Sequence, residues 1–443
     1  MPEQQVTTDT DKSARHWLAL TPDRLVVAML VVSGSLLAFD HFGWIGTHGQ
    51  KGWPVFLAVT FTGLALLYLV GRFAASLLFG RQFQFHLRTL LLLVLAVAGL
   101  CSWMLVQVRE SQHRADATAA LRAAGMDVHY DLKPGVGTNV PKGPQVLREN
   151  LGDAFFSEGE SIQPSMSGND PFGPSAARKV DDDDFQLFKA SAPNATRIRF
   201  PGTKITDAGL VHLQQFSELE VLELSNTGIT DIGLVHLEPL TSLRTLHLDG
   251  TRVTDAGMAH LAKLVELRCL YLDRTAVGDM GVKHLIRLPA LESLRLEATL
   301  VTDKGMKDIA QLEHLTSLTL SKTQVTDGGL EFLGNLQQLQ SITLRDTAIT
   351  DAGFKHLHGL TELQWLNLRE TKIADDGMMY LEDSTKLEVL FLDATDISDV
   401  GLEPLRKFNV LRVLGLQDTK VTDAGLKELQ ELLPNCKILV SSP

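Results

Sequence analysis

Apolar positions recur with a fixed period of 24 residues over the C-terminal part of the chain. In residues 227–250, leucines first recur every three residues and then alternate with polar residues. Alternation is typical of a strand buried on one face, and spacing of three to four residues is typical of one face of a helix. Each period therefore predicts a short helix followed by a short strand, and the chain predicts an α/β stack of such units.

Three polar positions accompany the leucines in every period. Thr227, Asp231 and Gly233 have counterparts in ten aligned copies, which run from Thr203 to Gly425 without insertion or deletion. The threonine is expected to bond the backbone of its own or the next coil. Thr230 and Asp231 are predicted to supply a helix N-cap, and Gly233 to permit close packing or an unusual backbone angle. A calcium-binding ladder of carboxylates is the alternative, but one Asp per coil offers too few oxygens.

Histidines also form a column at one helical position, which consists of His212, His236, His260, His284 and His356. A metal site needs several ligands at about 2 Å from one ion. Helices on neighbouring coils lie about 8–10 Å apart, which disfavours a shared ion. We interpret the column as a half-exposed helix position and expect neither a metal nor a cofactor.

Eleven strands are predicted, from 195–200 to 435–440, and together they form a curved parallel sheet with convex helices. The side chains between the buried leucines face the concave surface, where sequence variation sets specificity. Asp249, Asp273 and Glu297 predict an acidic strip, and Arg345 and Arg369 a basic one. Exposed Trp, Tyr and Arg dominate many protein interfaces. The predicted partner-binding residues are His247, Asp249, Tyr271, Asp273, Arg295, Glu297, Arg345, Trp365, Asn367, Arg369 and Phe391, and an ordinary solvated sheet surface is the alternative.

Three apolar runs precede the repeats, at 25–45, 53–71 and 89–108. Each run has the length of a transmembrane helix, so residues 24–108 are predicted to form a membrane domain behind a tail at 1–23. Six basic residues flank the spans on one side and four on the other. This excess favours a cytoplasmic N-terminus and an extracytoplasmic repeat domain.

Between the membrane and the repeats, residues 109–132 predict a helix and a short strand. Residues 133–184 are rich in Pro, Gly, Ser and charge, and predict a flexible linker that ends in a solvated acidic run, 181–184. The apolar segment 145–156 is a candidate for docking on the repeats. The repeat domain is predicted to occupy residues 185–443.

Composition narrows the function. The net charge of −12 disfavours a general nucleic-acid binder. The three cysteines show neither a disulfide framework nor zinc-ligand spacing. No nucleophile–base arrangement and no phosphate loop has supporting context, so the chain is predicted not to be an enzyme.

The repeats, with their recurring "TDAGL", resemble leucine-rich repeats of the ribonuclease-inhibitor type found in F-box adaptors. The run "FHLRTLLLLVLAVAGLCSWMLVQVRESQHRADATAALRAAGMDVHYDL" resembles the anchor and juxtamembrane segment of membrane-linked leucine-rich-repeat proteins of planctomycete bacteria. The resemblance covers about residues 85–443. It implies an anchored repeat scaffold and brings no catalytic residues.

Three hypotheses follow. The first is a membrane-anchored binding module that holds a protein or peptide on the concave face. The second is a structural envelope protein that self-assembles, with the C-terminal end of the solenoid as one contact. The third, a cytoplasmic adaptor, requires the opposite topology. An enzyme or transporter that uses Asp40 and His41 of the first span has thin support.

Overall fold

The strands of this protein follow one another across a single sheet in chain order. The structure, a computed structural model, describes residues 63, 87–123, 126–130, 159–164 and 180–440. Within these residues the sheet has 13 strands, and every neighbouring pair from β2 to β13 is parallel. The strands are β1 (Met126–Tyr130), β2 (Gly159–Pro164), β3 (Arg197–Arg199), β4 (Val221–Glu223), β5 (Thr245–His247), β6 (Cys269–Tyr271), β7 (Ser293–Arg295), β8 (Ser317–Thr319), β9 (Ser341–Thr343), β10 (Trp365–Asn367), β11 (Val389–Phe391), β12 (Val413–Gly415) and β13 (Lys437–Leu439). Strands β3 to β13 confirm the eleven predicted from the sequence.

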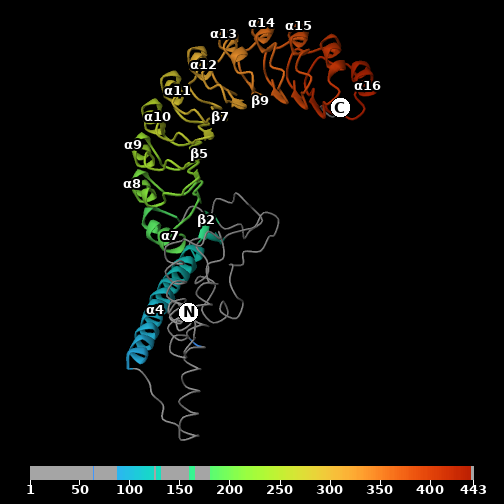
Figure 1. The fold of residues 1–443 in the computed structure, drawn as a ribbon. Helices are drawn as coiled ribbons and strands as arrows, with labels where there is room; N and C mark the ends of the chain where they lie inside the picture. The colour runs from blue at the N-terminus through green and yellow to red at the C-terminus, as the bar shows by residue number, and fades with distance from the viewer. Residues whose placement is uncertain (1–62, 64–86, 124–125, 131–158, 165–179, 441–443) are drawn as a thin grey trace, which may run out of the picture. The chain divides into compact units, whose positions relative to one another are not determined.

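A short helix connects each strand of the repeats to the next, and the helices line the outer side of the arc that the repeats form (Figure 1). Several coils continue the α-helix as a 3-10 turn, and in one coil the 3-10 helix η8 (Asp399–Lys407) replaces it. The helices are α8 (Asp207–Leu210), α9 (Asp231–Leu234), α10 (Asp255–Leu261), α11 (Asp279–Leu285), α12 (Asp303–Ile309), α13 (Asp327–Leu330), α14 (Asp351–Phe354), α15 (Asp375–Met378) and α16 (Asp423–Leu432). The predicted α/β solenoid is thus confirmed.

The core is a stack of similar layers that consist mostly of leucine. In the coil around β5, the buried side chains are Ile229, Leu234, Leu237, Leu240, Leu243, Leu246 and Leu248. Burial of one such side chain contributes about 1.5–3 kcal/mol, so the layers supply the main stabilisation of the repeats. The parallel register, for example Leu246 opposite Leu222 and Leu270, places each leucine directly against its counterparts.

The turn after each strand is tight. Thr227 donates its hydroxyl to the carbonyl of Leu224 at 2.6 Å, and its counterparts repeat this bond within their own coils. The residue before the threonine has a positive φ, as Ala298 shows at 55°. Eight non-glycine residues adopt this left-handed conformation among the described residues.

The repeated aspartate does not cap its own helix, which corrects the prediction from the sequence. Thr230 is the N-cap, since its hydroxyl accepts the N–H of Ile232 at 3.3 Å. The Asp231 carboxylate instead accepts the backbone N–H and the hydroxyl of Thr254 on the next coil, at 2.8 and 2.7 Å. We call this series of carboxylates the outer ladder; its members are Asp182, Asp207, Asp231, Asp255, Asp279, Asp303, Asp327, Asp351, Asp375 and Asp399.

The outer ladder explains the glycine two positions after each aspartate. A Cβ atom at Gly257 would collide with the Asp231 carboxylate and with the side chain of Leu234. Gly257 lies in the helix α10 and has no positive φ. Close packing, and not an unusual backbone angle, is therefore the reason for this glycine.

The residues just before the first repeat are ordered, although the sequence predicts a linker and a solvated acidic run there. Strand β2 pairs with β3, and Asp181–Asp184 contains the short helix η2 (Asp182–Asp184). Asp182 accepts the N–H of Thr206 at 2.9 Å and thereby starts the outer ladder. The next helix, α7 (Phe185–Ser191), buries Phe185 and Phe188, which pack against Phe200.

The chain forms two compact units, Met1–Asp116 with Tyr130–Glu158, and Ala117–His129 with Gly159–Pro443. Two predicted membrane spans, 25–45 and 53–71, lie outside the described residues apart from Gly63. The third, 89–108, falls within the helix α4 (Leu87–Ala123). In the described part of the chain, no helix has both the length and the apolar character needed to cross a membrane. The structure therefore does not support the third predicted span.

Candidate functional site

The predicted binding residues lie on or just after the strands β5 to β11, between the buried leucines. They form two groups. We call the first the tyrosine cluster: His247, Asp249, Tyr271, Asp273, Arg295 and Glu297. We call the second the tryptophan cluster: Arg345, Trp365, Asn367, Arg369 and Phe391. Adjacent strands bring the members of the tyrosine cluster together, as the register of the sheet requires. In the tryptophan cluster, contacts join Trp365, Asn367, Arg369 and Phe391, whereas Arg345 lies after the neighbouring strand β9 and pairs with Glu370.

Ring stacking organises the tyrosine cluster. The His247 and Tyr271 rings are parallel within 4°, with centroids 4.1 Å apart. The Arg295 guanidinium carbon lies 5.6 Å from the Tyr271 centroid, within the range of a cation–π contact. These contacts fix three polar side chains from three adjacent strands in one orientation.

Carboxylates link the same strands through their backbone. Asp249 accepts the N–H of Asp273 at 3.2 Å, and Asp273 accepts the N–H of Glu297 at 2.8 Å. Asp393 repeats the arrangement with the N–H of Gln417 at 3.0 Å. We call Asp249, Asp273 and Asp393 the inner ladder. In each of these aspartates, one carboxylate oxygen accepts the backbone N–H of the next coil, and the other oxygen contacts a side chain of the concave face.

Those second oxygens hold the candidate binding residues. Asp273 accepts a hydrogen bond from Arg295 Nε at 2.8 Å. Asp249, one coil earlier, accepts a hydrogen bond from the Ser225 hydroxyl at 3.0 Å. The His247 ring nitrogen lies 3.7 Å from the Asp249 carboxylate. The inner ladder thus anchors a histidine and an arginine beside Tyr271.

The two aspartates of this cluster have opposite pKa shifts. Burial disfavours the charged form of Asp249, but hydrogen bonds from His247 and Ser225 and the charge of His247 outweigh it and lower the pKa of the carboxyl group. Burial dominates at Asp273 and raises its pKa, although the Glu297 N–H and Arg295 stabilise the carboxylate. Burial also raises the pKa of Tyr271.

A cavity of about 300 Å³ opens at the tyrosine cluster. All six predicted residues of the cluster line it, together with four that the sequence analysis did not select: Glu223, Ser225, Asn226 and Arg274. The repeat could have identified Glu223 and Ser225, because they occupy the positions of His247 and Asp249 one coil earlier. The other two precede the repeated threonine, at the left-handed turn position.

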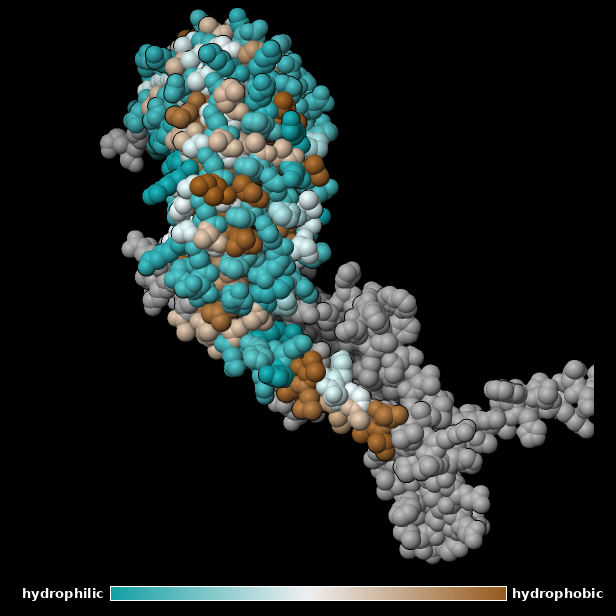
Figure 2. All heavy atoms as spheres, turned by 90° about the vertical axis from the view of Figure 1, so that its left-hand side faces the viewer, coloured by the Kyte–Doolittle hydropathy of each residue, from teal (hydrophilic) through white to brown (hydrophobic). Residues whose placement is uncertain are grey.

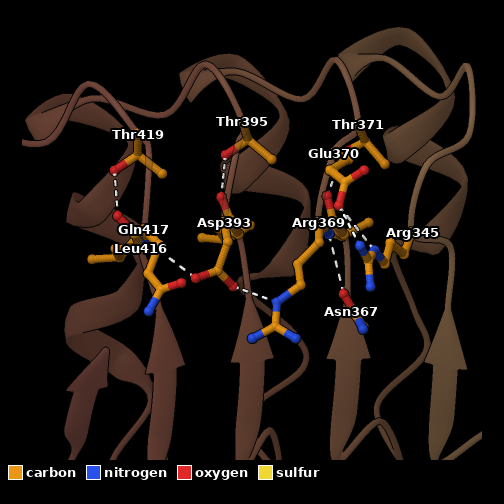
Figure 3. A network of polar contacts seen from close by, with 12 residues as sticks. Arg345, Asn367, Arg369, Glu370, Thr371, Asp393, Thr395, Leu416, Gln417 and Thr419 are labelled. Carbon is orange, nitrogen blue, oxygen red and sulfur yellow. Dashed lines mark hydrogen bonds and ion pairs between the residues drawn. The ribbon is translucent and has the colours of Figure 1, made fainter. Parts of the chain in front are cut away.

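The tryptophan cluster combines aromatic rings with a fixed arginine. Trp365 and Phe391 meet edge to face at 5.5 Å, and the Arg369 guanidinium carbon lies 4.0 Å from the Phe391 centroid. Arg369 Nε donates to Asp393 at 2.6 Å, and the Asn367 side chain accepts the N–H of Arg369 (Figure 3). Trp365 remains 41% exposed on the concave face.

The predicted acidic and basic strips are both neutralised, which changes the expected charge of the face. Arg295 pairs with Asp273, and Lys322 approaches Glu297 to 3.4 Å. Arg345 donates twice to Glu370 (Figure 3). Glu370 and Asp393 were not among the predicted site residues, because pairing between coils depends on side-chain reach and not on the repeat alone.

The histidine column lies on the convex helices. His260 bonds Glu238 of the preceding coil at 2.8 Å, and His236 bonds Gln214 at 3.3 Å. Among the described residues, no group of His, Cys, Asp and Glu is arranged to hold a metal ion. The three cysteines are not in disulfides.

Comparisons with known proteins agree with the repeat pattern. The family model described as "Leucine-rich repeat region" matches residues 203–394. The matched segment contains both the tyrosine cluster and the tryptophan cluster. No curated protein matches the chain.

Several solved structures are similar to the chain. An internalin (inlF) from Listeria monocytogenes str. 4b F2365 is 21% identical, with a TM-score of 0.43, over 58% of this chain and 83% of the internalin. A leucine-rich-repeat protein of Leptospira interrogans is 20% identical, with a TM-score of 0.46, over 58% of this chain and 62% of its own length. An internalin C2 from the same Listeria strain is 27% identical, with a TM-score of 0.38, over 47% of this chain and 84% of that chain.

Within the matched segment, the structure shows what the repeated residues do. The leucines form the buried layers, the threonine closes the turn, and the aspartate and glycine lock each coil to the next. Residues 203–394 of this chain therefore have both the sequence pattern and the coil structure of a leucine-rich-repeat region.

Proposed function

We propose that the repeat domain is a binding module that holds a protein or peptide ligand on its concave face. The observation that carries this proposal is the exposure of Trp365 beside Phe391 and Arg369. Trp and Arg are the residue types that contribute most to protein interfaces, and they act best when grouped. A leucine-rich-repeat scaffold is also typical of protein–protein interaction modules.

The tryptophan cluster is held in place before any ligand arrives. The ion pair with Asp393 and the stacking on Phe391 fix the Arg369 side chain. Asp393 is itself bonded to the backbone of the next coil. Because immobilising a flexible side chain costs free energy on binding, this preorganisation favours affinity.

The test compares the full chain with the double variant Trp365→Ala/Arg369→Ala and with Trp365→Ala alone. Extract of the source cells is passed over each immobilised protein, and retained proteins and peptides are identified and titrated. Loss of an interface anchor of about 2 kcal/mol weakens binding about thirtyfold. We expect that loss for both variants, with thermal melting to show that the single variant stays folded.

Ile232→Ala is the matched control, because Ile232 is an apolar side chain, 73% exposed, on the convex helix α9. The convex side carries such apolar residues as patches separated by hydrophilic surface (Figure 2). The control is expected to bind as the unchanged protein does. Equal retention by the unchanged protein and by both Trp365 variants would refute the assignment of the ligand to the tryptophan cluster.

Self-association is a second candidate function. Leu432 and Val440, in and after the last described coil, are 43% and 42% exposed. An apolar surface at this end of the repeats favours contact with another copy of the chain. Sedimentation of the full chain over a hundredfold concentration range tests this idea, and a constant monomer mass would exclude it.

The location of the domain stays a prediction from the sequence. The first two predicted spans lie outside the described residues, and the resemblance to planctomycete proteins rests on sequence alone. Protease treatment of intact spheroplasts tests the predicted extracytoplasmic side.

A further inference from the structure

The middle of the concave face differs chemically from both clusters. Strands β8 and β9 present four hydroxyl side chains there: Ser317, Thr319, Ser341 and Thr343. We call them the hydroxyl patch. The register pairs Ser317 with Ser341 and Thr319 with Thr343, so the four form a compact square on two adjacent strands.

None of the four hydroxyls has a hydrogen-bond partner among the residues that the structure describes. All four side chains are half-buried, so each hydroxyl remains accessible from the concave side. A hydroxyl group donates one hydrogen bond and accepts two. The patch therefore offers a dense set of unused donors and acceptors with no formal charge.

The next strand, β10, adds two groups of matching character. Trp365 is the register partner of Ser341, and Asn367 is the partner of Thr343. Trp365 presents an exposed aromatic surface at the edge of the patch. Asn367 uses its side-chain oxygen for the N–H of Arg369, which leaves its amide NH₂ group to donate to a ligand.

The arginines on both sides of the patch are already paired. Arg295 is bound to Asp273 on one side, and Arg345 is bound to Glu370 on the other. An anionic ligand on the patch would therefore find neither arginine free to pair with it. A neutral ligand that carries many hydroxyl groups satisfies the unused donors and acceptors without desolvating a charge.

We propose that the hydroxyl patch, with Trp365 and Asn367 at its edge, is a binding site for a neutral saccharide chain. The apolar C–H face of a sugar ring stacks on Trp365, and its hydroxyl groups exchange hydrogen bonds with the four hydroxyls and the Asn367 amide. The strands lie about 4.8 Å apart, so an extended oligosaccharide that crosses β8 to β10 meets a new pair of polar side chains at each strand. This site goes beyond the proposed protein or peptide ligand and stands without it.

The experiment measures binding of neutral hexasaccharides (cellohexaose, xylohexaose, mannohexaose and chitohexaose) to the full chain by isothermal titration calorimetry. A heparin hexasaccharide serves as the charged comparison. We expect at least one neutral hexasaccharide to bind and the heparin hexasaccharide not to bind. If no neutral member of the panel binds at up to 10 mM, or if only the heparin hexasaccharide binds, the proposal is overturned.

Variants then locate the site. Thr319→Val/Thr343→Val keeps the β-branched shape that suits a strand but removes two hydroxyls. Loss of two hydrogen bonds weakens binding about tenfold or more. Thr361→Val, at an exposed threonine outside the patch, is the matched control and is expected to bind unchanged.

The outcome separates this site from the proposed protein or peptide site. Because Thr319 and Thr343 are not part of the tryptophan cluster, their double variant should lose the saccharide and keep the protein or peptide ligand. Saccharide binding that survives both Thr319→Val/Thr343→Val and Trp365→Ala would refute the site.

Discussion

Two ladders of carboxylates connect the coils of this solenoid, and they differ in how strictly they repeat. The outer ladder, on the helix side, has ten members and continues without a gap from Asp182 to Asp399. The inner ladder, on the concave side, has only Asp249, Asp273 and Asp393. Both accept the backbone N–H of the next coil, yet only the inner one also holds surface arginine and histidine side chains.

The difference shows where this chain tolerates variation. Most outer carboxylates bond both the N–H and the hydroxyl of one residue of the next coil, as Asp231 does, and each packs against a glycine of the repeat. An inner carboxylate makes a bond between coils that other coils lack, and those coils are folded without it. We therefore expect the variable concave side, where the inner ladder is interrupted, to carry the function. We expect the continuous outer ladder to stabilise the fold.

Breaking the outer ladder should produce the largest effect. Asp231→Ala removes the acceptor of both the N–H and the hydroxyl of Thr254. Hydrogen bonds to a charged group contribute about 1.5–3 kcal/mol each, so we expect the loss of both to destabilise the fold by about 3–6 kcal/mol. Urea unfolding of the full chain measures it.

Asp376→Ala is the matched control for that loss. Asp376 lies beside the ladder residue Asp375 on α15, but its side chain is exposed and bonds no described residue. We expect less than about 0.5 kcal/mol for this exposed position. Similar losses for Asp231→Ala and Asp376→Ala would show that the outer ladder does not support the fold.

The outer ladder also has weak points that a substitution should repair. Ala374 stands where most coils have Thr, so Asp351 receives only its backbone N–H, and α15 has no side-chain cap. Ala374→Thr adds an N-cap hydroxyl and a second bond to Asp351. Since the backbone of Ala374 is already extended like that of Thr350, we expect stabilisation of about 1 kcal/mol.

Thermal melting of Ala374→Thr against the unchanged protein measures this gain. Ala352→Thr, two positions after the N-cap Thr350, offers a control with the same change of side chain at an exposed site. A gain for Ala352→Thr equal to that of Ala374→Thr would mean that the hydroxyl acts by some means other than the ladder.

Much of this architecture follows from the sequence, but the partners across coils do not. The period of two in each strand correctly placed Tyr271 and Trp365 on the concave face. The same pattern attributed helix capping to Thr230 and Asp231 alike, because periodicity shows which side of a coil a residue occupies and not which neighbour it reaches. The actual cap, Thr230, is one residue earlier, and the bond of Asp231 reaches 23 residues ahead.

The structure of the segments without regular leucine spacing was harder to predict from the sequence. Strand β2 and the helix η2 lie in a stretch of Pro, Gly, Ser and Asp that predicts a linker. Their order comes from edge pairing with β3 and from the bond of Asp182 to Thr206, which are long-range contacts. The ion pairs of Arg345 and Arg369 escaped prediction for the same reason.

The inner ladder is expected to respond to acid in two opposite ways. The folded-state pKa of Asp249 is lowered, so its contribution is present above the unfolded pKa of about 3.9 and is lost as pH falls through the folded value. The pKa of Asp273 is raised, so the folded state binds the proton more readily and this group favours folding as pH falls.

When the pH is lowered from about 5 to 2, the free energy of unfolding should fall less for Asp249→Asn than for the unchanged protein. It should fall more for Asp273→Asn than for the unchanged protein. Urea unfolding at several pH values in that range measures both slopes. Each variant is the control for the other, because both replace one aspartate by asparagine and remove the same charge. Slopes altered in the same direction by the two variants would contradict the opposite pKa shifts.

The smallest effect is expected where the inner ladder is interrupted. Ser321 occupies the position of Asp273 two coils later, and its buried hydroxyl has no partner among the described residues. Ser225 occupies the same position in an earlier coil, but donates to Asp249. Ser321→Ala should change stability by less than about 0.5 kcal/mol or increase it, because a buried hydroxyl without a partner is costly, whereas Ser225→Ala should cost about 1 kcal/mol. If thermal melting shows an equal loss for both, the Ser321 hydroxyl has a partner in solution, and the inner ladder extends further along the concave face than Asp249, Asp273 and Asp393.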